Sequence, residues 1–158
     1  MVIAGFLFIG LPEIQAQTTQ AKLNQIELFK QFIGNWKCEL AKDTVYYMEM
    51  RAFGTGLDIY DKTVVKDNVI SEEKELYDYD CDLDKYVGVD LYKNKRIFVF
   101  AMWFASEKKM IAVGYKDISD PDKASFKAEI EFLSSNAFSQ TIYSNNKFTA
   151  KNYFTRIK

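Results

Sequence analysis

The feature that most constrains the fold is a period-two alternation of apolar and polar residues, which recurs from Asn35 to the end of the chain. The run 125–132 shows it most clearly, because apolar residues from Phe126 to Phe132 alternate with Ser, Lys and Glu. Successive side chains of a β-strand point to opposite faces, so such a run predicts a strand with one buried face. Ten strands are expected, spanning residues 35–40, 44–52, 57–65, 69–79, 85–92, 96–104, 110–117, 125–132, 138–144 and 147–157.

Tight turns separate these runs. Gly54-Thr55-Gly56 offers two glycines for the positive φ angles of a hairpin, and Asn145-Asn146 suits a type I′ turn. Thirteen Phe and ten Tyr against two Pro favour pleated, half-buried strands. Short turns favour sequential antiparallel pairing, and closing the sheet removes its exposed edges. We therefore expect an all-β fold, an antiparallel up-and-down β-barrel of about 8–10 strands.

The first residues are typical of an export signal. Val2 to Leu11 is an uninterrupted apolar or glycine run, which is too short for a membrane span but suits the core of a signal peptide. Pro12 ends it, and we expect cleavage after Ala16 and a secreted or periplasmic protein. The alternative is a buried N-terminal strand. No later apolar run approaches the length of a membrane span.

Residues 17–158 are expected to form one barrel domain, since no stretch resembles a linker. Apolar residues recur every three or four positions between Ala21 and Ile33, which predicts a short amphipathic helix ending at Gly34. This helix can cap one open end of the barrel. The run 96–105 is apolar on both faces, so its second face should be covered either by the helix, which we favour, or by a protein partner.

Composition excludes several classes of chemistry. The chain has no histidine, so Ser-His and Cys-His catalysis are excluded, and neither a metal nor a cofactor is expected. The net charge of −1 gives no reason to expect a nucleic-acid partner. Cys38 and Cys81 form either a disulfide or two separate thiols. Alternating aspartates from Asp78 to Asp84 are read as a solvated acidic loop, with calcium binding as the less favoured alternative.

The segment Gly34-Asn35-Trp36 resembles the Gly-x-Trp signature that opens the first strand of lipocalins and related calycins. Arg156, on the last strand, stands where that superfamily places an arginine that packs across the tryptophan. Together with Gly54 to Gly56, Trp103-Phe104 and Thr155-Arg156, the chain from about Leu28 to Arg156 is similar to secreted bacterial lipocalin-like proteins of unassigned function. The resemblance implies a barrel in which Gly34, Trp36 and Arg156 are structural residues, and it does not imply a function.

Apolar residues on the expected inward faces are candidates to line a ligand cavity: Tyr46, Met48, Met50, Leu57, Ile59, Phe98, Phe100, Met102, Phe126, Ile130 and Phe138. Small barrels can hold one ligand, and flexible Met side chains adapt to its shape. The alternative is a barrel filled by these side chains.

Asp61, Glu73 and Arg51 are candidate polar anchors for a ligand. Glu73, or Glu75, would face the lumen together with Asp61 on the neighbouring strand, and Arg51 or Lys62 would have to lie close to balance their charge. The alternative is a charged edge strand that prevents aggregation.

The function expected from these patterns is a non-enzymatic carrier or sequestering protein for a small hydrophobic or amphiphilic molecule. The alternative is a protein-interaction module with a filled barrel, such as an inhibitor or envelope-associated factor. A third hypothesis, an enzyme that uses carboxylates and tyrosines, would need a carboxyl group with a raised pKa inside the cavity.

Overall fold

The computed structural model describes residues 22–92 and 97–158, and these form a closed antiparallel β-barrel of ten strands. The expected all-β fold class is confirmed. The strands are β1 (Gly34–Ala41), β2 (Thr44–Phe53), β3 (Gly56–Val65), β4 (Asn68–Asp80), β5 (Lys85–Tyr92), β6 (Ile97–Phe104), β7 (Lys109–Gly114), β8 (Phe126–Ser134), β9 (Ala137–Ser144) and β10 (Lys147–Ile157). The expected signal peptide, residues 1–16, lies outside the described residues, as do residues 93–96.

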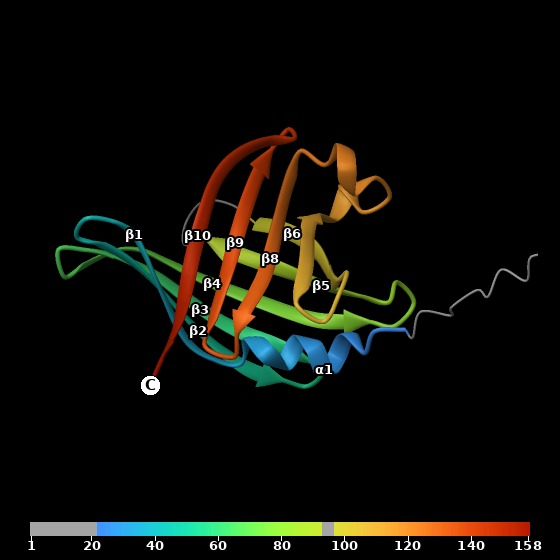
Figure 1. The fold of residues 1–158 in the computed structure, drawn as a ribbon, viewed down its shortest axis with the longest axis horizontal. Helices are drawn as coiled ribbons and strands as arrows, with labels where there is room; N and C mark the ends of the chain where they lie inside the picture. Colours follow the sequence, from blue (N-terminus) through green and yellow to red (C-terminus); the bar gives the residue numbers. More distant parts are fainter. Residues whose placement is uncertain (1–21, 93–96) are drawn as a thin grey trace, which may run out of the picture.

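Each strand pairs with the next in the chain, and β1 pairs with β10 to close the barrel (Figure 1). The turns explain why sequential pairing is easy. Asn145 and Asn146 both have positive φ, as a type I′ hairpin requires. Gly54 has a φ of 59°, but the expectation of a positive φ at Gly56 was wrong. Position 56 requires glycine because space is lacking: a Cβ added to Gly56 would lie 1.7 Å from the Tyr77 carbonyl oxygen.

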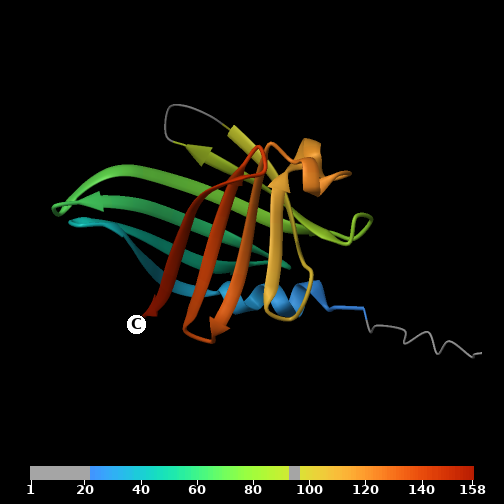
Figure 2. The same cartoon turned by 45° about the horizontal axis from the view of Figure 1, so that its top comes forward.

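The N-terminal helix closes one end of the barrel. It consists of α1 (Gln25–Phe29) and a 3-10 turn, η1 (Lys30–Phe32), and is shorter than predicted because the Asn24 side chain caps its start by accepting a hydrogen bond from the Glu27 amide. Gln25 is buried and forms two hydrogen bonds with the backbone of Phe104 in β6. Figures 1 and 2 show α1, in blue, at the lower end of the barrel.

Strand β7 ends earlier than the sequence predicts. Residues 115–117, expected to continue it, form the 3-10 turn η2 (Tyr115–Asp117), followed by η3 (Pro121–Lys123). Asp117 accepts hydrogen bonds from the backbone and hydroxyl of Ser125, which fixes this connection before β8 begins. A short side-chain turn of this kind competes with the β ladder, and the period-two pattern alone does not reveal it.

Trp36 and Arg156 lie together beside the helical end. The indole of Trp36 is fully buried and donates to the Phe32 carbonyl oxygen at 2.7 Å, while the Arg156 guanidinium lies 4.2 Å from its ring centroid. Arg156 also donates to the carbonyl oxygens of Gln31, Ile33 and Ser135. Gly34 leaves room for it, since a Cβ there would lie 2.2 Å from Arg156 Nη1.

The outer face of β6 is covered differently from the sequence expectation. The helix packs on inward-facing residues at the barrel end, and η2 packs against β6 instead. Ala101 on that face is fully buried, whereas Ile97 and Val99 stay exposed. The expectation that the helix covers the outer face of β6 is therefore wrong, because the helix places Phe29 and Phe32 inside the barrel.

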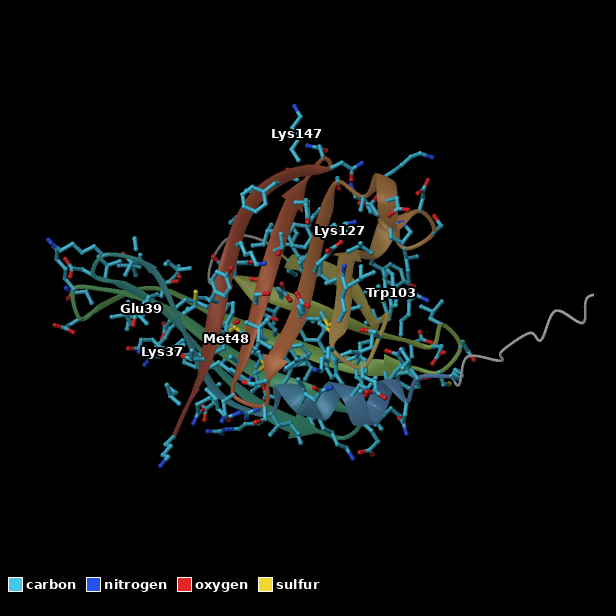
Figure 3. The ribbon with its side chains drawn as sticks, viewed as in Figure 1. Lys37, Glu39, Met48, Trp103, Lys127 and Lys147 are labelled. Atoms are coloured by element: carbon cyan, nitrogen blue, oxygen red, sulfur yellow. The ribbon has the colours of Figure 1, made fainter. Side chains whose placement is uncertain are left out.

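The two cysteines are separate free thiols, with Cys38 buried and Cys81 exposed. Charged side chains such as Lys37 and Lys147 project from the outside, whereas Met48 lies among the strands of the barrel (Figure 3). In the described part of the chain, the helices are all shorter than a bilayer-crossing helix has to be.

Candidate ligand cavity

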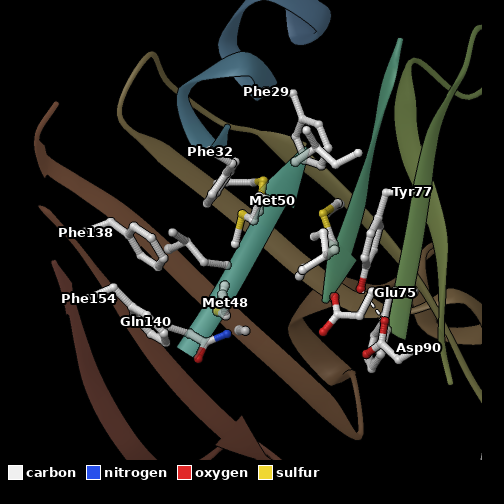
Figure 4. A pocket seen from close by; sticks show the side chains of 18 of the residues that line it. Phe29, Phe32, Met48, Met50, Glu75, Tyr77, Asp90, Phe138, Gln140 and Phe154 are labelled. Carbon is white, nitrogen blue, oxygen red and sulfur yellow. Dashed lines mark hydrogen bonds between the residues drawn. The ribbon is translucent and has the colours of Figure 1, made fainter. Parts of the chain in front are cut away.

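A cavity of about 140 Å³ lies inside the barrel, between α1 and the inward faces of the strands (Figure 4). The lining is mostly apolar, with Glu75, Tyr77, Asp90 and Gln140 as its polar members. The apolar lining residues are Phe29, Phe32, Met48, Met50, Leu57, Ile59, Phe100, Met102, Met110, Ala112, Phe126, Ala128, Ile130, Phe138 and Phe154.

Most of the residues expected to line a cavity do so. Met48, Met50, Leu57, Ile59, Phe100, Met102, Phe126, Ile130 and Phe138 are in contact with it. Tyr46 and Phe98 are on the correct face but not in the lining. Phe98 lies far enough along β6 to remain 41% exposed, and Tyr46 packs against Phe154, with ring centroids 6.1 Å apart. Four of the five methionines line the cavity, and Met1 is outside the described residues.

Strand register places acidic residues inside the barrel. Asp61 of β3 pairs with Glu73 of β4, and Glu75 on the same face of β4 pairs with Asp90 of β5. Carboxylate oxygens of Asp61, Glu73 and Glu75 lie within 4.8 Å of one another. Asp61 is fully buried and Asp90 is 6% exposed, so four carboxyl groups from three adjacent strands form one acidic belt. The acidic belt thus consists of Asp61, Glu73, Glu75 and Asp90.

Burial dominates the electrostatics of the acidic belt. Desolvation raises the pKa of Asp61 to about 6 and the pKa of Asp90 to about 7. Burial and then the charge of Asp61 raise the pKa of Glu75 well above its ordinary value, and burial also raises the pKa of Glu73. The belt is therefore harder to ionise at near-neutral pH than four exposed carboxyl groups would be.

The expectation that Arg51 is a polar anchor inside the barrel is wrong. It lies on the outer face of β2, where it is exposed and ion-pairs with Glu49. Lys62 likewise lies outside, with its ammonium 5.6 Å from the Tyr47 ring centroid. Strand alternation is the reason: inward residues of β2 and β3 have even and odd numbers respectively, which excludes both cations. No lysine or arginine among the described residues lines the cavity.

Tyr77 links the acidic belt to the apolar part of the cavity. Its hydroxyl donates to Asp90 Oδ1 at 2.5 Å, a contact visible in Figure 4, and its ring is 3% exposed. Gly88, its cross-strand partner on β5, makes room for that ring, since a Cβ on Gly88 would lie 2.1 Å from Tyr77 Cδ1. Gly88 thus fixes where Tyr77 and Asp90 meet.

We expect Gly88→Ala to destabilise the protein by about 1–3 kcal/mol, because the added methyl group overpacks against a buried ring. Urea denaturation measures the change. Gly114→Ala is the matched control, since the nearest atom to its added Cβ is 3.7 Å away. In a Tyr77→Leu background the cost of Gly88→Ala should fall, and an unchanged cost would contradict the proposed contact.

Tyr77, Asp90 and Gln140 are cavity residues that the sequence did not single out. In β5 the sequence Val-Gly-Val-Asp-Leu places the aliphatic residues on the outside and Asp90 on the inside. Only the register against Glu75 could have identified Asp90. Gln140 pairs with Ile130, whose inward orientation was predicted, so that pairing was the available signal.

The fold and cavity define a closed, ten-stranded antiparallel β-barrel with an internal chamber, an architecture compatible with a lipocalin-like fold. No protein-family model matches the chain, and no curated protein matches it in sequence.

Proposed function

We propose that this protein binds a small hydrophobic or amphiphilic molecule inside its barrel and acts as a carrier or sequestering protein. The observation that carries the proposal is the cavity of about 140 Å³, lined by apolar side chains with a few convergent polar groups. Such a lining is typical of small-molecule sites. An apolar cavity of about 150 Å³ is large enough for benzene, which sets the size of the ligand's apolar part.

Residues 1–16 support a location outside the cytoplasm. The apolar run that ends at Pro12 favours export and cleavage after Ala16, which would leave the barrel domain in the periplasm or outside the cell. A carrier in that compartment would meet its ligand after export.

Binding of a neutral probe tests the proposal. We expect benzyl alcohol to shift the ¹³C-methyl NMR resonances of Met48, Met50, Met102 and Met110 in a saturable way, because all four line the cavity. Ala128→Leu, which adds volume to the lining, should abolish the shifts. Val99→Leu, on the exposed outer face of β6, should leave them unchanged. Absence of saturable shifts, or shifts that persist in Ala128→Leu, would contradict the proposal.

A second candidate function is acid–base catalysis within the same cavity. The raised pKa of Asp61 and Asp90 favours it, because a general acid or base works best when its pKa is near the operating pH. Turnover of a ligand identified by binding, lost in Asp90→Asn, would be the result that distinguishes an enzyme from a carrier.

A further inference from the structure

The acidic belt combines two features that point to an absent positive charge. Its members Asp61, Glu73 and Glu75 bring carboxylate oxygens within 4.8 Å of one another. Asp61 is fully buried, and neither of its oxygens has a hydrogen-bond partner of normal geometry, although Tyr46 and Glu75 lie near enough to affect its pKa. Buried carboxylates are costly unless they are protonated or paired.

The surroundings of the belt supply hydroxyl groups but no cation. Tyr46 of β2, Tyr77 of β4 and Tyr92 of β5 lie close enough to interact electrostatically with these carboxylates. No lysine or arginine in the described ranges lines the cavity, so no cation of the lining neutralises Glu75 or Asp90, the two belt residues that line it.

We propose that the ligand of this cavity carries a protonated primary amine, whose ammonium group binds among Asp61, Glu73 and Glu75 while its apolar part occupies the adjoining chamber. This inference rests on the proposed function and names the chemistry of the ligand. An ammonium group has three N–H donors, which match three carboxylates from two strands. Such charge-assisted hydrogen bonds are the strong ones.

The neighbours of the belt favour an amphiphilic amine over a bare metal ion. Met48 pairs with Asp61 across the strands, and Ile59 pairs with Glu75, so apolar side chains adjoin the carboxylates directly. Glu75 belongs to both the belt and the cavity lining. A ligand with a cationic head and an apolar body of roughly benzene size uses both parts, whereas a metal ion uses only the belt.

Binding of the ammonium group should release a proton. Burial and then the charge of Asp61 raise the pKa of Glu75 well above its ordinary value, and a bound ammonium group would lower it again. The ammonium group keeps its own protons, Glu75 gives its proton to solvent, and the carboxylate that results pairs with the bound cation. Charge is balanced, because one cation enters as one proton leaves.

A pair of isosteric probes tests the inference. We expect benzylamine to bind at least about tenfold more tightly than benzyl alcohol, since its hydrogen bonds to the belt are charge-assisted. Calorimetry in two buffers of different ionisation enthalpy should show proton release with benzylamine and none with benzyl alcohol. Asp61→Asn, which changes a belt residue outside the cavity lining, should remove the preference for the amine and preserve the affinity for the alcohol. Glu75→Gln should also remove the preference for the amine.

The outcomes separate this inference from the proposed function. The matched control is Asp58→Asn. Asp58 lies on the outer face of β3 and forms an ion pair with Lys74 of β4, so this variant should keep the preference for the amine. Equal affinity for the two probes would overturn the amine inference and leave the proposed function standing. Failure of both probes to bind would overturn both. Displacement of benzylamine by Mn²⁺ or Ca²⁺ alone, lost in Asp61→Asn, would show a metal site and overturn the amine inference.

Discussion

Asp61→Asn is expected to stabilise the unliganded barrel by about 2 kcal/mol or more at pH 8, and by clearly less at pH 5, which lies inside the titration window. The pKa of Asp61 is raised to about 6 in the folded protein from an ordinary value of 3.8. Each unit of pKa shift corresponds to about 1.4 kcal/mol. An amide of the same shape carries no charge, so it avoids the desolvation cost that the carboxylate meets once it ionises.

The sign of the pH dependence follows from the raised pKa. The folded state binds more protons than the unfolded state between the ordinary pKa near 4 and the folded values of about 6 for Asp61 and 7 for Asp90. Stability is therefore greatest below this window and falls as the pH rises through it. Urea denaturation of the wild type at pH 5 and pH 8 should show the loss, and Asp61→Asn should remove part of it.

The matched control is Asp58→Asn, since Asp58 lies on the same strand but faces outward toward Lys74. It should leave the pH dependence of stability in place. An Asp61→Asn protein that is less stable than the wild type at pH 8 would contradict the account of the acidic belt. It would mean that the charged form of Asp61 is satisfied by its surroundings.

Trp36→Ala is expected to destabilise the protein by about 3–5 kcal/mol, the usual cost of removing a large buried aromatic side chain. Trp36 is fully buried, and its ring centroid lies 4.8 Å from that of Phe138. Its Nε1 donates a hydrogen bond to the Phe32 carbonyl oxygen. The substitution also removes the ring on which Arg156 stacks. Urea denaturation gives the free energy of unfolding, and Trp36→Phe gives a milder variant if the alanine protein does not fold.

Trp103→Ala controls for the loss of a tryptophan as such. Trp103 is half-buried on the outer face of β6, with the Lys85 ammonium 5.0 Å from its ring. Its removal should cost about 1 kcal/mol or less, since substitutions away from the core are usually mild. Equal costs at the two positions would contradict the assignment of Trp36 to the closed end of the barrel.

The sequence predicts the barrel well because its main signal is local. Alternation marks each strand, and turn residues such as Asn145-Asn146 join consecutive strands, so the order of pairing follows from the order of the chain. Strand ends were less predictable. The hydrogen bonds from Ser125 to Asp117 turn residues 115–117 out of the sheet, and no period-two pattern encodes such a contact.

The candidate site was only partly predictable, because β4 carries charged residues on both faces and β5 carries its pattern inverted. In β4 the inward face holds Glu73 and Glu75, and in β5 it holds Asp90, while Leu76 and Leu91 point outward and are exposed. Hydrophobic alternation by itself therefore assigns β5 the wrong face. The charges of Asp61 and Glu73 were recognised from the sequence, but their convergence with Glu75 and Asp90 depends on the register across three strands.

The acidic residues on the inward faces of β3, β4 and β5 distinguish the interior of this barrel from a purely apolar core. Tyr77 and Gly88 position Asp90 beside the apolar chamber, and Asp61 and Glu75 complete a belt of carboxyl groups whose pKa is raised by burial and then by their neighbours' charges. Burying so many acidic groups is unfavourable for stability alone. In our proposal, this cost is offset when a ligand enters, which links the instability of the empty belt at neutral pH to its affinity for an amine.

The most direct test of the central claim is a crystal structure of the protein with benzyl alcohol. The account predicts the aromatic ring of the probe inside the barrel, between Met50 and Phe138, with α1 still closing the end. An interior filled by side chains, or a probe bound only on the outer face of the sheet, would contradict it.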